Sequence, residues 1–298
     1  MFKDWIGKKI LSANKLFGKD LEKKFSYIYR YEYLNNCSLN SNVSGVSNIK
    51  YCDSEVIVSL TTYGNRLYEV YLAIESIMQQ SLKSNRIVLW LSDELKDCTL
   101  PIVLQKQQRR GLDIRYCKDI RAYTKLIYSL KEFPNEIIIT IDDDHLYYFD
   151  LIEVLVNSYK TNSNFIYSQD ILNMKLMSHD KLEKYSKWKK VNNNTPSHFN
   201  FPRGVGGVLY PPNCFNNEVF NENVFLDICK YADDIWFKAM ALFNGTMAQR
   251  IFTHNKNDID CLTNKASEHS TLNHINKNMN DIQLKSVFDK YKLYEKLI

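Results

Sequence analysis

Short apolar runs alternate with helical stretches from residue 55 to residue 141. Strand candidates cover residues 56–60, 86–91, 112–116 and 136–141. Apolar side chains between the first two candidates recur at helical spacing, and helices are expected near 101–110 and 122–132. Strands that alternate with helices predict an α/β fold, a mainly parallel sheet covered by helices on both faces. Ligands in such folds bind beyond the carboxyl ends of the strands.

Charge and cysteine content exclude several functions. Lysine and arginine outnumber aspartate and glutamate by 39 to 34, and residues 1–24, with seven lysines against three acids, supply most of the excess. The remaining chain is near neutral, without the basic face of a nucleic-acid-binding protein. Its seven scattered cysteines include no C-x-x-C pair and are typical of cytosolic thiols. The sequence has no membrane-spanning apolar run and no signal-peptide pattern, which predicts a cytoplasmic protein.

The N-terminal residues 2–25 carry apolar side chains three or four positions apart, with lysines mostly off that line. This pattern indicates an amphipathic helix. One interpretation is an interfacial helix on an anionic membrane, with Phe2 and Trp5 among the lipid headgroups. The other is a helix packed on its own domain. Residues 38–48 are rich in serine, asparagine and glycine and predict a linker.

Three adjacent carboxylates, those of Asp142, Asp143 and Asp144, directly follow the most apolar strand. Like charges repel and are costly to bury unpaired, so this position demands a cation or solvent. Carboxylates together with substrate phosphates suit Mg²⁺ or Mn²⁺. A nucleotide-sugar donor requires such a metal, because the departing diphosphate develops negative charge. A solvated acidic turn is the alternative.

Two further motifs have both a structural and a functional interpretation. Gly204, Gly206 and Gly207 fall within four residues, which indicates either a turn before a strand or backbone that approaches a ligand closely. Asp233 and Asp234 open a segment with an apolar helical face, so they are expected at a helix N-terminus. Acids are favoured there by the helix dipole, and one of them could also act as general base for an acceptor hydroxyl.

Five motifs resemble, in their order along the chain, bacterial glycosyltransferases of the GT-A fold that build surface polysaccharides and lipopolysaccharide. They are TTYGNR, DIRAYTK, the DDD strand end, GVGGVLYPP and ADDIW. The resemblance covers about residues 54–252. It implies a Rossmann-like GT-A domain over residues 51–260. An N-terminal amphipathic helical segment with a linker is expected at residues 1–50, and a polar helical tail at residues 261–298.

The resemblance also implies roles for individual residues. Asp144 and Asp142 are expected to bind the metal, and some members of the fold place a third ligand at the position of His254. Asp234 is expected to be the catalytic base, with Asp233 beside it. The residues expected at the nucleotide-sugar donor are Thr61, Tyr63, Arg66, Arg121, Lys125, Asp142, Asp143, Gly206 and Gly207.

These features together predict a hexosyltransferase-like glycosyltransferase that depends on Mn²⁺ or Mg²⁺ and inverts the configuration of the sugar. It would act in bacterial surface glycan biosynthesis, moving a sugar from a nucleotide-diphosphate donor to a hydroxyl of a glycan or lipid-linked acceptor. Two alternatives stay open: a retaining transferase, and a non-catalytic protein of the same fold that binds nucleotide sugars or glycans. A cytoplasmic location is expected, alone or with peripheral contact to the inner membrane, and no nucleic-acid partner.

Overall fold

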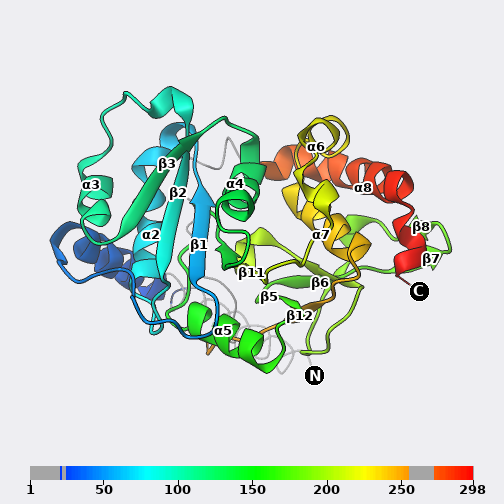
Figure 1. The fold of residues 1–298 in the computed structure, drawn as a ribbon, viewed down its shortest axis with the longest axis horizontal. Helices are drawn as coiled ribbons and strands as arrows, with labels where there is room; N and C mark the ends of the chain where they lie inside the picture. The colour runs from blue at the N-terminus through cyan, green and yellow to red at the C-terminus, as the bar shows by residue number, and fades with distance from the viewer. Residues whose placement is uncertain (1–20, 22–24, 255–271, 298) are drawn as a thin grey trace, which may run out of the picture.

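The computed structural model describes residues 21, 25–254 and 272–297, with only the backbone described at 272–278. Its central element is a seven-stranded sheet in the order β12-β5-β11-β4-β1-β2-β3 (Figure 1). The strands of this sheet are β1 (Val56–Thr61), β2 (Arg86–Ser92), β3 (Leu112–Cys117), β4 (Ile137–Thr140), β5 (Ile166–Ser168), β11 (Val208–Tyr210) and β12 (Ala248–Arg250). The helices are α2 (Val70–Met78), α3 (Ile102–Gln108), α4 (Thr124–Glu132), α5 (Leu151–Thr161), α6 (Glu222–Ile228), α7 (Asp233–Phe243) and α8 (Leu272–Tyr291), preceded by a helix over residues 25–40.

The four strands expected from the sequence form one half of the sheet and run parallel. β1 pairs with β2 and β4, and β2 pairs with β3. In the other half, β11 runs antiparallel to β4 and β5, and β12 runs parallel to β5. The predicted α/β fold with a mainly parallel sheet flanked by helices is confirmed. The strand order reverses at β1, since β2 lies on one side of it and β4 on the other, and crevices that bind ligands open at such a switch point.

Two hydrophobic cores, one on each face of the sheet, follow from the alternation of side chains along its strands. On β1, Val56, Val58 and Leu60 belong to one core and Ile57 to the other. The first core is closed by α2, α3 and α5, and the second by α4, α6, α7 and α8. Because β1, β2 and β4 are buried on both faces, they are largely apolar runs, which is why the sequence reveals them.

Smaller elements surround the antiparallel half of the sheet. A three-stranded sheet has the order β10-β6-β9, and β7 pairs with β8 in a hairpin. The strands concerned are β6 (Ile171–Asn173), β7 (Leu176–Ser178), β8 (Lys181–Leu182), β9 (Lys189–Lys190) and β10 (Asn200–Pro202). Within the predicted C-terminal tail, α8 contributes Leu284, Val287 and Phe288 to the core beside α7. The division of the chain at residues 50 and 260 stays a prediction.

The N-terminal segment is anchored by a buried ion pair. Arg110 binds both carboxylate oxygens of Glu75, at 2.8 and 2.9 Å, and both side chains are nearly inaccessible to solvent. The same guanidinium donates to the carbonyl oxygens of Cys37 and Val43. The predicted linker at residues 38–48 therefore begins in the helix over 25–40 and is then held against α2 and α3. The predicted amphipathic helix at residues 2–25 lies almost entirely outside the described residues. No helix within the described ranges is long and apolar enough to cross a bilayer.

Replacing Glu75 by glutamine should leave the charge of Arg110 buried without a counterion. We expect the free energy of unfolding to fall by about 3–5 kcal/mol, measured by urea denaturation followed by circular dichroism. The matched control is Glu55→Gln, which removes the surface pair between Glu55 and Arg86 and should cost less than about 1 kcal/mol. Equal, small losses in both variants would contradict the anchoring role of the buried pair.

Candidate active and metal site

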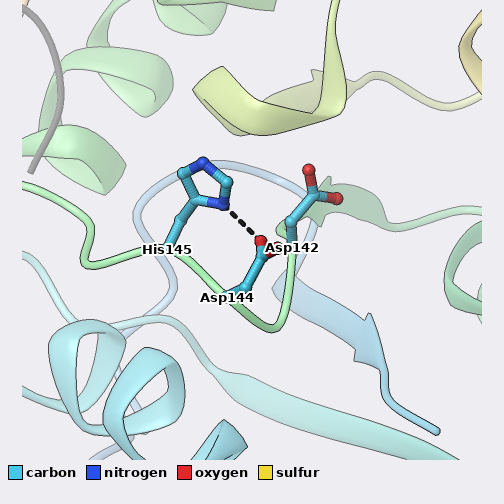
Figure 2. Close-up of side chains that lie close together, drawn as sticks. All are labelled: Asp142, Asp144 and His145. Carbon is cyan, nitrogen blue, oxygen red and sulfur yellow. Dashed lines mark hydrogen bonds and ion pairs between the residues drawn. The ribbon is translucent and has the colours of Figure 1, made fainter. Parts of the chain in front are cut away.

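The acidic cluster lies on the loop that follows β4, at the switch point of the sheet. Asp142, Asp144 and His145 each offer one ligand atom, and these three atoms lie within 4.8 Å of one another (Figure 2). Mixed carboxylate and imidazole donors of this kind suit Mn²⁺ and related divalent cations. The donor set therefore fits the predicted metal, with His145 in addition to the two expected aspartates.

Asp143 is not in this group and is almost completely buried. Its carboxylate accepts a hydrogen bond from Thr62 at 2.6 Å and is paired with Arg66 at 2.7 Å. Burial raises the pKa of Asp143 above its usual value, against the opposing charge of Arg66. Thr62 and Arg66 follow β1, so this contact joins the loops after β1 and β4. Asp143 is thus placed as a support for the loop.

The carboxylate of Asp144 has two neighbours, the imidazole of His145 and the guanidinium of Arg66. His145 Nδ1 lies 2.5 Å from one carboxylate oxygen, and Arg66 lies 3.3 Å from the other. Burial alone would raise the pKa of Asp144, but the hydrogen bond and charge of His145, with Arg66, hold it below its usual value. Asp144 is therefore ionised at neutral pH, as a metal ligand must be.

Lys125 joins the acidic loop to α7. Its ammonium lies 2.7 Å from Asp142 and 3.2 Å from Asp233, and the side chain is almost completely buried. Burial would lower the pKa of this lysine, but the carboxylates of Asp142, Asp233 and Asp234 outweigh it and raise the pKa well above the usual value. Lys125, which was expected at the nucleotide-sugar donor, therefore lies as a buried cation between Asp142 and the neighbouring acids Asp233 and Asp234.

Asp234 lies on the first turn of α7, as the sequence predicts. Both of its carboxylate oxygens accept from the backbone N–H of Gly204, each at 3.1 Å. Burial, and then the neighbouring charge of Asp233, raise the pKa of Asp234 to about 8. A carboxyl whose pKa lies near the working pH is well suited to general acid–base chemistry.

The three glycines of the turn over residues 204–207 lie close to neighbouring groups. A Cβ atom on Gly204 would lie 3.0 Å from Lys125 Nζ and 3.1 Å from Asp142 Oδ1. On Gly206 it would lie 2.4 Å from the backbone nitrogen of Asp170. Gly207 has a φ of +71°, which disfavours any side chain. Packing accounts for Gly206 and Gly207, and their contact with a donor stays a prediction.

Three more of the expected donor residues are Thr61, Tyr63 and Arg121. Thr61 donates to the carbonyl oxygen of Trp90, and the exposed Tyr63 lies beneath Arg66. Arg121 is exposed, with its guanidinium over the ring of Tyr231.

His254, the expected third metal ligand, is paired with Asp150 and stacks on Phe149. Its side chain is 79% exposed. The three-residue ligand group contains His145 in place of His254, and a ligand role for His254 stays a prediction.

Sequence reasoning missed several residues of the site. Thr62, one position after an expected residue, is the threonine that binds Asp143. Tyr147 accepts from the backbone N–H of Asp142 through its hydroxyl at 2.7 Å and so fixes the start of the loop. The period of two along β1 would have separated Thr61 from Thr62, since neighbouring side chains point to opposite faces. For Tyr147 the sequence carries no comparable signal.

Neither a protein-family model nor a curated protein matches this chain. Among solved structures, it is similar to CMP:2-keto-3-deoxy-manno-octonic acid synthetase complexed with CTP, with a TM-score of 0.42 and 11% identity over 75% of this chain and 99% of that one. It is also similar to 4-diphosphocytidyl-2C-methyl-D-erythritol synthase, with a TM-score of 0.44 and 8% identity over 74% of this chain and 99% of that one. Neither likeness is strong enough to assign an activity.

The ligand group predicts a thermal response to metal. Adding Mn²⁺ should raise the melting temperature of the wild-type protein, because a ligand that binds only the folded state stabilises it. The variant Asp144→Ala should lose most of that rise. Asp180→Ala is the matched control, since Asp180 also lies beside a histidine, His179, but at an exposed position. An unchanged Mn²⁺ response in Asp144→Ala would refute the site.

Proposed function

We propose that this protein is a divalent-metal-dependent glycosyltransferase that moves a sugar from a nucleotide-diphosphate donor to an acceptor hydroxyl. The observation that carries the proposal is the placement of two acidic groups around one buried cation. Asp142 of the ligand group contacts Lys125, and so does Asp233, the neighbour of the candidate general base Asp234. A metal-binding group and a group with general-base chemistry thus lie side by side at the switch point of the sheet.

The charge balance of the site supports a divalent cation. Asp234 is mostly protonated at pH 7, because its pKa is raised to about 8. The four remaining carboxylates, of Asp142, Asp143, Asp144 and Asp233, face the cations of Lys125 and Arg66. By formal charge, four carboxylates thus face two cations, with His145 not counted. Asp142 and Asp144 would hold the metal with His145, and the bound cation would supply charge stabilisation for the departing diphosphate.

Asp234 is the proposed general base. It takes the proton from the acceptor hydroxyl while the acceptor oxygen forms a bond to the anomeric carbon. The bond from that carbon to the diphosphate breaks at the same time, and the nucleoside diphosphate leaves with the electron pair. The N–H of Gly204 orients the carboxylate, and the ammonium of Lys125 lies 3.2 Å from Asp233 beside it. Direct displacement of this kind inverts the anomeric configuration.

Substituting Asp234 by asparagine keeps the size of the side chain but removes the proton acceptor. We expect kcat to fall by at least about a hundredfold, since general-base assistance contributes about 10² to 10⁴ in rate. Donor affinity should change little, and Asp233→Asn should cost less. The product should have the inverted anomeric configuration by NMR. Retained configuration would exclude Asp234 as the base and favour the retaining alternative.

The pH dependence of kcat/KM gives an independent test. Because the pKa of Asp234 in the free protein is raised to about 8, the base is protonated below that pH. The value of kcat/KM should rise about tenfold per pH unit up to pH 8 and then level off. A flat profile between pH 6 and about 8 would show that the base titrates elsewhere.

A panel of nucleotide sugars with and without Mn²⁺ distinguishes the proposed enzyme from a binding protein of the same fold. Release of nucleoside diphosphate that depends on Mn²⁺ and is lost in Asp144→Ala supports the transferase. Donor binding without turnover, across a panel of acceptors, would support the binder. Calorimetry on the same donors separates the two outcomes, because it reports binding whether or not turnover follows.

A further inference from the structure

The helix over residues 25–40 exposes an apolar stripe. Phe25, Ile28, Tyr29 and Tyr33 lie three or four positions apart, so they share one face. Their exposed fractions are 66, 53, 77 and 48%. We call these four residues the aromatic stripe. A contiguous exposed apolar surface of this kind usually marks an interaction site.

The opposite face of this helix is already buried and fixes its orientation. Leu34 packs with Leu72 and Leu146 in a small core, against which Tyr27 and Tyr31 also lie. Tyr71 donates to Asn35 at 2.9 Å. Because these contacts hold the inner face, the helix cannot rotate about its axis to bury the aromatic stripe without losing them.

The helix lies close to the candidate site. Leu146, which its inner face contacts, directly follows His145 of the ligand group. Farther along the same loop, the guanidinium of Arg30 lies 5.5 Å over the ring of Tyr148. A surface that binds the stripe would therefore lie close to the loop that carries the ligand group.

We infer that the aromatic stripe docks on an anionic lipid bilayer. Tyrosine and phenylalanine rings suit the boundary between headgroups and acyl chains, which accepts an apolar ring together with a polar edge. The 24 residues that precede the stripe carry seven lysines and three acids, an excess of positive charge that complements anionic lipid. Between Phe25 and Asn40, Glu32 is the one acidic residue. Docking here presents the site to hydroxyls of acceptors anchored in the membrane.

The test is sedimentation of the full-length protein with vesicles. We expect binding to vesicles that contain phosphatidylglycerol, weaker binding to pure phosphatidylcholine, and loss of binding in high salt as charges are screened. The double variant Ile28→Ser, Tyr29→Ser should bind about tenfold or more weakly, because it removes apolar area from the stripe. This readout does not involve turnover, so it can fail while the proposed glycosyl transfer holds.

The matched control replaces two apolar side chains that are equally exposed on other faces. Ile102 lies on α3 and Met177 on β7, and each is more than half exposed. The variant Ile102→Ser, Met177→Ser should bind vesicles as the wild type does, and unchanged melting curves show that both variants fold. Equal vesicle binding by both double variants would overturn the inference. So would wild-type protein that binds equally well to vesicles with and without phosphatidylglycerol. The inference would also be overturned if the wild type formed a dimer without lipid and the variant Ile28→Ser, Tyr29→Ser were monomeric. The stripe would then bind a second copy of the chain.

Discussion

The buried ammonium of Lys125 is the interaction on which the candidate site depends. It contacts Asp142 after β4 and Asp233 at the start of α7, two residues that are far apart in the sequence. Without this cation, the carboxylates of Asp142 and Asp233 would repel one another. The sheet positions the acids, and Lys125 allows them to stay there together.

The acids differ in state because their neighbours differ. Asp144 has a lowered pKa beside His145 and Arg66, whereas burial next to Asp233 raises the pKa of Asp234 to about 8. Ligation requires a permanently ionised group, and proton transfer requires one that titrates near the working pH. Two aspartates in one site can thus suit different chemistry, because their neighbours shift their pKa values in opposite directions. Loop, turn and helix each contribute some of these neighbours.

The sequence was sufficient for the parallel half of the sheet and for the location of the acids, but not for the antiparallel half or for the partners of the acids. Buried parallel strands are largely apolar runs, so β1, β2 and β4 and the acids after β4 were predictable. The pairing of Lys125 with Asp233 depends on how α4 and α7 pack on the sheet, which no local pattern encodes. His254 was expected near the metal because of its place in the sequence. Its ring is paired with Asp150, and the ligand group contains His145, so a metal-binding role for His254 stays a prediction.

Gly204 connects the separate parts of the site more closely than any charged residue. Its amide holds Asp234, and the position where a Cβ would stand is bounded by Lys125 and Asp142. An alanine methyl there would crowd these two side-chain ends, so Lys125 or Asp142 would have to shift by a few tenths of an ångström. The residues that position 204 tolerates are therefore expected to depend on the side chains at positions 125 and 142. Such epistasis limits which neighbouring sequences can be reached by single substitutions.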